Sequence, residues 1–62
     1  MPIVQIDLLE GRTVEQKKLM VEKVTAAIVE STGAPSERVT IIIRDLAKEN
    51  LAVAGVLASE RK

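Results

Sequence analysis

The residues best suited to chemistry stand at the start of the chain, where Met1 precedes Pro2. An initiator methionine before a small residue such as proline is commonly removed, and its removal leaves Pro2 with a free secondary amine. An α-amino group titrates at about 7.7 to 8.0 in unstructured peptides, and an apolar pocket or a nearby cation disfavours its protonated form. The sequence therefore predicts a general base that works near neutral pH. The alternative is an ordinary proline at the start of a strand, where no ladder hydrogen bond is needed.

The composition removes most competing chemistries. The chain has no histidine and no cysteine, so it lacks the side chains of a Ser-His-Asp triad, a thiol nucleophile or the usual zinc sites. We therefore expect neither a metal nor another cofactor. Disulfides are excluded, and we find no apolar run long enough for a membrane span and no basic leader before an apolar stretch. These features predict a cytoplasmic protein without a membrane partner.

The charge pattern argues against nucleic acid as a partner. Nine basic and nine acidic side chains cancel, and they alternate along the chain instead of clustering. Binding to nucleic acid usually needs a basic surface, and binding to single strands usually adds aromatic stacking platforms. The chain has no aromatic residue. A solvated surface of mixed charge is the interpretation that these features favour.

The length allows one domain, which we place over residues 1–62, with Met1 removed. A domain near 60 residues buries only about 60% of the surface that its unfolded chain exposes. Such chains usually need a disulfide, a metal or association with other copies. Because cysteine and histidine are absent and 47% of the residues are hydrophobic, we expect a homo-oligomer.

The hydrophobic pattern predicts a strand over residues 2–9 and a helix over residues 14–32. In the first segment alternate residues are apolar, as on one face of a strand. Thr13 and Gln16 have the spacing of a capping box, which marks the start of the helix. Gly33 stands where many helices end with a left-handed residue. Both helix boundaries are therefore predicted from local signals.

A second strand is predicted over residues 39–43, which are β-branched throughout. Strand, helix and strand make a βαβ unit of the α/β class, with parallel strands. Residues 48–50 are typical of a turn. The apolar run over 51–57 suits a short hairpin or an arm that faces a partner subunit. We expect residues 59–62 to be frayed.

Five short segments together resemble the 4-oxalocrotonate tautomerase family, whose subunits are of similar length. They are spread over the whole chain: 2–6 (Pro-Ile-Val-Gln-Ile), 9–12 (Leu-Glu-Gly-Arg), 15–17 (Glu-Gln-Lys), 34–35 (Ala-Pro) and 47–48 (Ala-Lys). The resemblance implies a βαβ subunit with a short C-terminal hairpin. It also implies a homohexamer, a trimer of dimers in which each dimer forms a four-stranded sheet.

The resemblance also implies a reaction. In this family the N-terminal proline, freed of methionine, is the base that moves a proton between oxygen and carbon of an enol or dienol. By position Pro2 is that base, and Arg12 is the cation that holds a carboxylate of the substrate. The implied substrate is a small anionic dienol or 2-oxo acid such as 2-hydroxymuconate. A guanidinium suits the second role because its planar fork matches a carboxylate, and its field near Pro2 would disfavour the protonated amine. The alternative for Arg12 is a solvated arginine in a turn.

The chain departs from the family pattern at two positions that line the implied substrate site. Thr40 stands where well-studied members have a second arginine, supplied by a neighbouring subunit, and Leu51 stands where they have a phenylalanine that forms an apolar wall. Leu51 can still exclude water, but Thr40 carries no charge. Arg38 and Arg44 are expected on the same strand face as Thr40, and either could replace the charge or be an ordinary surface residue. Whether the substrate carries two carboxylates is left open.

Two other functions remain compatible with the sequence. One is hydration or dehalogenation of an unsaturated acid, with protonated Pro2 as the acid, although no group that activates water is apparent. The other is a non-catalytic oligomeric module that keeps the fold, because a fold does not establish a function. Retention of Met1 would favour the second, since the nitrogen of Pro2 would then be an amide without basicity.

Overall fold

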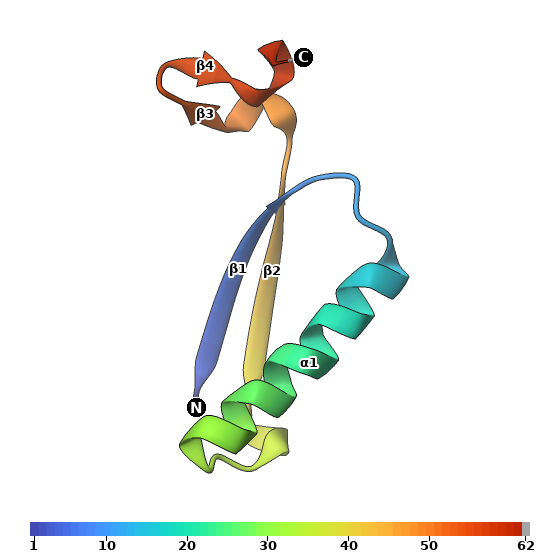
Figure 1. The fold of residues 1–62 in the computed structure, drawn as a ribbon, viewed down its shortest axis with the longest axis vertical. Coiled ribbons are helices and arrows are strands. Elements are labelled where there is room, and N and C mark those ends of the chain that lie inside the picture. The colour runs from blue at the N-terminus through green and yellow to red at the C-terminus, as the bar shows by residue number, and fades with distance from the viewer. Residues whose placement is uncertain (62) are drawn as a thin grey trace.

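The computed structural model describes residues 1–61 as a βαβ unit that is followed by a small hairpin (Figure 1). The predicted α/β class and the order of the elements are confirmed. The elements are β1 (Ile3–Leu9), α1 (Val14–Thr32), β2 (Thr40–Leu46), β3 (Ala52–Val53) and β4 (Val56–Leu57). Short 3-10 turns lie at Ser36–Arg38, Lys48–Asn50 and Ala58–Glu60. No helix within residues 1–61 combines the length and the hydropathy of a membrane span.

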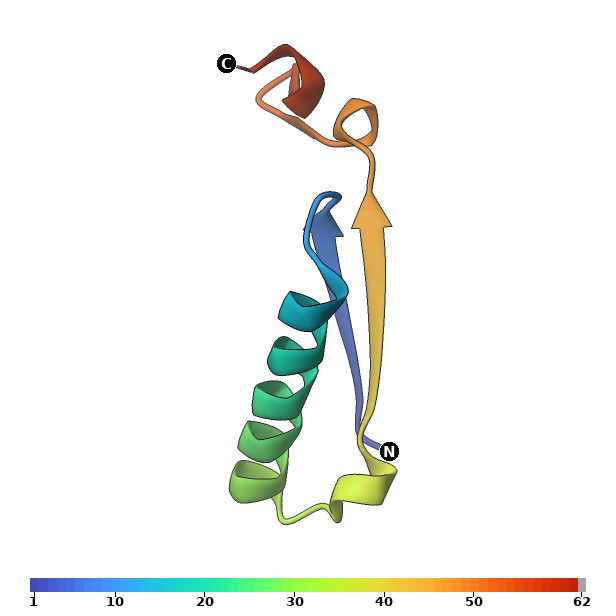
Figure 2. The same cartoon turned by 90° about the vertical axis from the view of Figure 1, so that its right-hand side faces the viewer.

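Strands β1 and β2 are parallel neighbours, and α1 connects them. Their register sets Ile3 opposite Thr40 at one end and Leu9 opposite Leu46 at the other. Helix α1 lies along one face of this two-stranded sheet, and Figure 2 shows that no element of residues 1–61 covers the other face. The hairpin extends beyond the far end of β2, so the molecule is elongated, with extents of 42 × 24 × 14 Å.

The ends of α1 follow the predicted local signals. The hydroxyl of Thr13 accepts a hydrogen bond from the backbone N–H of Gln16 at 3.1 Å, and the Gln16 side chain accepts one from the Thr13 N–H at 2.9 Å. At the other end Gly33 has φ +77°, and its N–H donates to the carbonyl of Val29 at 3.0 Å. A residue with a side chain would be strained at that φ, which explains the glycine.

The subunit has no fully buried side chain among residues 1–61. Half-buried apolar residues on the facing sides of the sheet and the helix include Val4, Ile6, Leu8, Met20, Val24, Ile28, Ile41 and Ile43. A single layer of helix on sheet covers each of these residues on one side only. Because burial of apolar surface is the main favourable term in folding, one copy alone retains little of it.

The uncovered face of the sheet carries both apolar and polar side chains, including one ion pair. Ile3 and Ile42 are 47% and 42% exposed there. Arg44 donates from Nε to the Oδ1 atom of Asp7, its partner across the strands, at 2.7 Å. Arg44 thus shares a strand face with Thr40 as expected, but its guanidinium is already bound to a carboxylate.

The sequence placed Arg38 on the same strand face as Thr40, and that prediction is wrong. Arg38 ends the 3-10 turn that precedes β2, and strand geometry begins only at Thr40. The alternation of side chains between the faces of a strand therefore does not apply to Arg38.

The C-terminal apolar run forms the predicted hairpin. Ala52 pairs with Leu57 and Val53 with Val56. The two residues between the strands, Ala54 and Gly55, have φ of +53° and +80°. Positive φ at both positions is the conformation of a type I′ turn, which matches the twist of the flanking strands.

The stretch expected to be frayed is ordered as far as residue 61, so that expectation is wrong. Ala58–Glu60 form a 3-10 turn, and Arg61 donates from Nη2 to the carbonyl of Val53 at 3.3 Å. The Ala58 N–H also donates to the Leu51 carbonyl at 2.8 Å, which ties the end of the chain to the hairpin. The remaining residue of that stretch, Lys62, lies outside the described residues.

Candidate active site

The N-terminal end of the sheet holds the proposed base through backbone contacts. The carbonyl of Pro2 accepts a hydrogen bond from the Thr40 N–H at 3.0 Å. The ammonium of Met1, which is present in this structure, donates to the carbonyl of Arg38 at 3.2 Å. Pro2 itself is half-buried. The backbone at Pro2 is therefore held by the pairing with the start of β2.

Two of the candidate substrate-binding residues lie at this same end. Thr40 is joined to Pro2 by the backbone bond and is exposed, with a neutral side chain. Arg38 is near the chain start through its carbonyl, and its exposed side chain has no carboxylate partner within residues 1–61. Ile3, the residue after Pro2, lies on the uncovered sheet face, so its side chain does not close a pocket around Pro2 within one chain.

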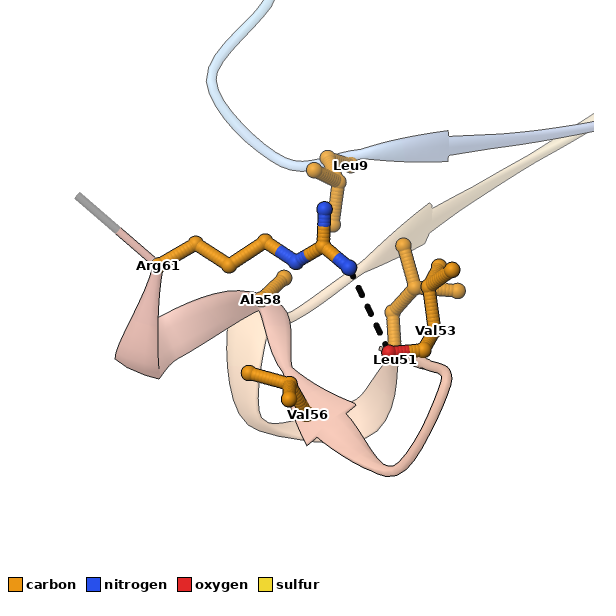
Figure 3. A pocket seen from close by; sticks show the side chains of 6 residues that line it. All are labelled: Leu9, Leu51, Val53, Val56, Ala58 and Arg61. Carbon is orange, nitrogen blue, oxygen red and sulfur yellow. Dashed lines mark hydrogen bonds between the residues drawn. The ribbon is translucent and has the colours of Figure 1, made fainter.

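The opposite end of the sheet has a cavity of about 150 Å³ between the end of β1 and the hairpin. It is lined by Leu9, Leu51, Val53, Val56, Ala58 and Arg61 (Figure 3). Leu51 thus contributes to an apolar wall of this cavity. Arg61 is the charged member of this lining, and its guanidinium reaches into the space between Leu9 and the hairpin.

Arg12 lies beside this cavity. Its Nη1 donates to the carbonyl of Leu9 at 3.1 Å, and the side chain of Leu9 lines the cavity. Gly11 makes this approach possible, because its φ of +118° is one that residues with a side chain rarely adopt. Arg12 is exposed and has no carboxylate partner within residues 1–61. A guanidinium in this state is available to an anionic ligand.

The proposed base and the proposed anion-binding arginine are not brought together within one chain. Pro2 precedes β1 and Arg12 follows it, so the two lie at opposite ends of the sheet (Figure 1). The seven steps from Pro2 to Leu9 span roughly 23 Å at about 3.3 Å per residue. No small substrate reaches both ends of one subunit.

Arg61 is the charged residue of the cavity, and the sequence did not single it out as a site residue. It falls in the stretch that was expected to be frayed, where a cation has no assigned place. The signal that was present is the apolar run of the hairpin, which ends four residues before Arg61. An arginine that follows such a run at short distance can fold back over it, because its long stem packs on apolar surface.

Acidic side chains do not form a metal site in the described part of the chain. Within residues 1–61 there is no group of three or more acidic or other metal-ligating side chains close enough to hold an ion. The two ion pairs there, Lys17 with Asp45 and Arg44 with Asp7, each join a helix or strand to a neighbouring strand. Both ion pairs therefore connect elements of the fold to one another.

The chain belongs to the tautomerase family of isomerases. Residues 2–61 match the family model described as tautomerase enzyme. A 2-hydroxymuconate tautomerase from Comamonas testosteroni is 57% identical over 60 residues, which cover 97% of this chain and 95% of the relative. The family resemblance that the short motifs indicated is thereby confirmed.

Solved structures of homologues have the same fold. YwhB, a homologue of 4-oxalocrotonate tautomerase, matches with a TM-score of 0.95 at 46% identity, over 98% of this chain and all of that one. A heterohexameric 4-oxalocrotonate tautomerase from Chloroflexus aurantiacus matches with a TM-score of 0.94 at 29% identity, over the whole of both chains. Oligomers of six subunits therefore occur among the relatives with this fold.

Proposed function

We propose that the chain, once Met1 is removed, is a cofactor-free tautomerase that acts on a small anionic dienol or 2-oxo acid such as 2-hydroxymuconate. The observation that carries this proposal is the placement of the groups at the two ends of the sheet. One end has a proline anchored by the backbone, and the other has the apolar cavity with Arg12 beside it. The tautomerase relatives support the same reaction class.

In the proposed reaction the Pro2 amine takes the proton from the enol oxygen and, as its conjugate acid, delivers a proton to carbon. Arg12 holds a carboxylate of the substrate through charge-assisted hydrogen bonds. Leu51 and the other apolar lining residues keep water away, which strengthens the electrostatic contacts to the substrate. No metal or redox group takes part in these steps.

The proposed site is formed by two copies of the chain. When two such sheets join about a twofold axis with their strands antiparallel, the start of β1 in one copy lies beside the hairpin end of the other. Pro2 and Arg12 from different copies then face one substrate. The resulting dimer has the four-stranded sheet that the family resemblance implies, and three dimers make the homohexamer that we propose. Burial of the exposed Ile3 and Ile42 favours such an assembly. The cytoplasm stays the predicted compartment.

The proposal is tested by comparing the processed protein with a form that retains Met1, each checked by intact mass. We expect the processed form to convert enol to ketone without added metal. Its kcat/KM should rise with pH as the amine loses its proton, because the unprotonated amine is the base. The form with Met1 should lose about 10²-fold to 10⁴-fold in rate, the usual contribution of a general base.

Sedimentation of both forms is the control, because only assembled proteins are comparable. A normally assembled form with Met1 that turns over enols as fast as the processed form would rule out Pro2 as the base. An assembled, processed protein without any turnover of enols would instead favour the non-catalytic module.

A further inference from the structure

The cavity at the hairpin end contains a cation that the proposed reaction does not yet use. Arg61 lines the cavity together with apolar side chains, and it has no carboxylate partner within residues 1–61. The only hydrogen bond of its side chain within residues 1–61 is the 3.3 Å contact from Nη2 to the Val53 carbonyl. A guanidinium carries several further N–H donors. Arg61 can therefore support the hairpin and bind an anion at the same time.

A second guanidinium approaches the same place. Arg12 donates to the carbonyl of Leu9, and the side chain of Leu9 forms a wall of the cavity that Arg61 enters. Two arginines without carboxylate partners within residues 1–61 thus each lie near Leu9. At the opposite end of the sheet Thr40 is neutral and Arg38 is the one arginine among the described residues, so the hairpin end holds more guanidinium groups for an anionic ligand.

We propose that Arg61 is a specificity-determining residue that binds a second carboxylate of the substrate. It supplies, from the end of the chain, a positive charge that Thr40 does not. The inference rests on the proposed function, since it takes Arg12 as the site of the first carboxylate. It narrows the substrate class to dienols or 2-oxo acids with two carboxylates, one for each arginine.

The test compares two unreactive ligands that differ by one carboxylate. Muconate is a six-carbon diene with a carboxylate at each end, and sorbate has a methyl group in place of one of them. Calorimetric titration of the processed protein should give a Kd for muconate lower than that for sorbate by about tenfold or more, as expected for one further charge-assisted hydrogen bond. Equal affinities in the unsubstituted protein would contradict the proposal.

Two substitutions separate the charge of Arg61 from its structural contact. Arg61→Gln keeps an N–H donor for the Val53 carbonyl but removes the charge, and it should abolish the preference for muconate while sorbate binding is unchanged. Arg61→Lys keeps the charge and should retain part of the preference. Lys23→Met removes an exposed charge from α1 and serves as the matched control, with no change expected. Sedimentation checks that each variant assembles.

Two results would overturn the inference. One is a full preference for muconate in Arg61→Gln, and the other is an equal loss of preference in Arg61→Gln and Arg61→Lys, which points to a structural role. Because these are binding measurements, they are independent of turnover. A protein that prefers muconate through Arg61 but converts no enol would refute the proposed function alone, whereas a tautomerase without that preference would refute only the role of Arg61.

Discussion

The two ends of β1 hold their functional groups in different ways. At the start of the strand, the Pro2 carbonyl accepts a backbone hydrogen bond from the Thr40 N–H, and this bond does not depend on Met1. At the other end, side chains from β1, the hairpin and the last 3-10 turn form a cavity next to Arg12. The location of the base is therefore insensitive to most side-chain changes, whereas the binding of an anion depends on individual side chains.

Substitutions at the two ends are therefore expected to affect different properties of the enzyme. A group held by the backbone keeps its place when nearby side chains change, so substitutions near Pro2 alter the chemistry mainly through charge. Substitutions at the cavity remove contacts to the ligand directly, so they act first on KM and on the choice of substrate.

The separation of the two ends is tested most strongly by mixing two proteins that are each strongly impaired. One is processed and carries Arg12→Ala, and the other retains Met1 with Arg12 intact. If Pro2 and Arg12 act from different copies, reassembly of the mixture restores activity, to about a quarter of the sites at equal amounts. The measurement is enol turnover before and after dissociation and joint reassembly. A mixed oligomer whose enol turnover does not rise on reassembly would mean that Pro2 and Arg12 act from the same copy.

Loss of the anion-binding arginine has the next largest expected effect. Arg12→Ala removes charge-assisted hydrogen bonds to a carboxylate, each worth about 1.5 to 3 kcal/mol. The expected loss in kcat/KM is about 10-fold to 100-fold, with KM rising more than kcat falls. Steady-state kinetics on a carboxylate-bearing enol checks this, with Lys23→Met as the control. A variant with unchanged KM would show that Arg12 is a solvated arginine of the turn.

A charge can also be added beside the proposed base. Thr40 is adjacent to Pro2 through the backbone, so Thr40→Arg places a guanidinium near the base. Turnover of a dienol with two carboxylates should rise several-fold, because a further charged donor then faces the substrate. If kcat/KM is equal or lower while assembly is normal, the charge needed at this site is already supplied elsewhere, by Arg38 or Arg61.

The smallest predicted effect concerns the scaffold of the cavity end. Ala54 has φ +53° in the type I′ turn, a conformation that asparagine tolerates better than alanine. Ala54→Asn should raise the free energy of unfolding by about 0.5 to 1 kcal/mol, measured by denaturant titration at fixed protein concentration. Ala52→Asn, in the adjoining strand, should give no gain. An equal gain from both would mean that relief of strain at positive φ is not the cause.

Several features of the fold followed from short stretches of sequence. The capping box of Thr13 and Gln16 and the left-handed Gly33 mark the helix at the predicted residues. The β-branched run predicts β2, although the strand begins at Thr40 and continues to Leu46 instead of covering 39–43. Such signals are reliable because the backbone conformation at a helix end depends mainly on the few residues that bond there.

The positions of the side chains in the candidate site were predicted less well than the helix ends. Arg38 was misplaced because a 3-10 turn precedes β2, and Arg44 is occupied because the parallel register sets it opposite Asp7. Arg61 was overlooked because its part in the cavity depends on a hairpin that folds back toward Leu9. Each of these facts depends on contacts between segments far apart in the chain, which local patterns do not specify.

The sequence by itself determined the kinds of groups available, an N-terminal proline and several arginines without histidine or cysteine, together with the order of strand, helix, strand and hairpin. The tertiary structure alone decided how these groups are distributed. A strand of seven residues holds Pro2 and Arg12 at its two ends, and the fold of the last residues brings Arg61 into the cavity. The physical reason is that residue type and local conformation depend on near neighbours, whereas proximity depends on register and packing across the whole chain.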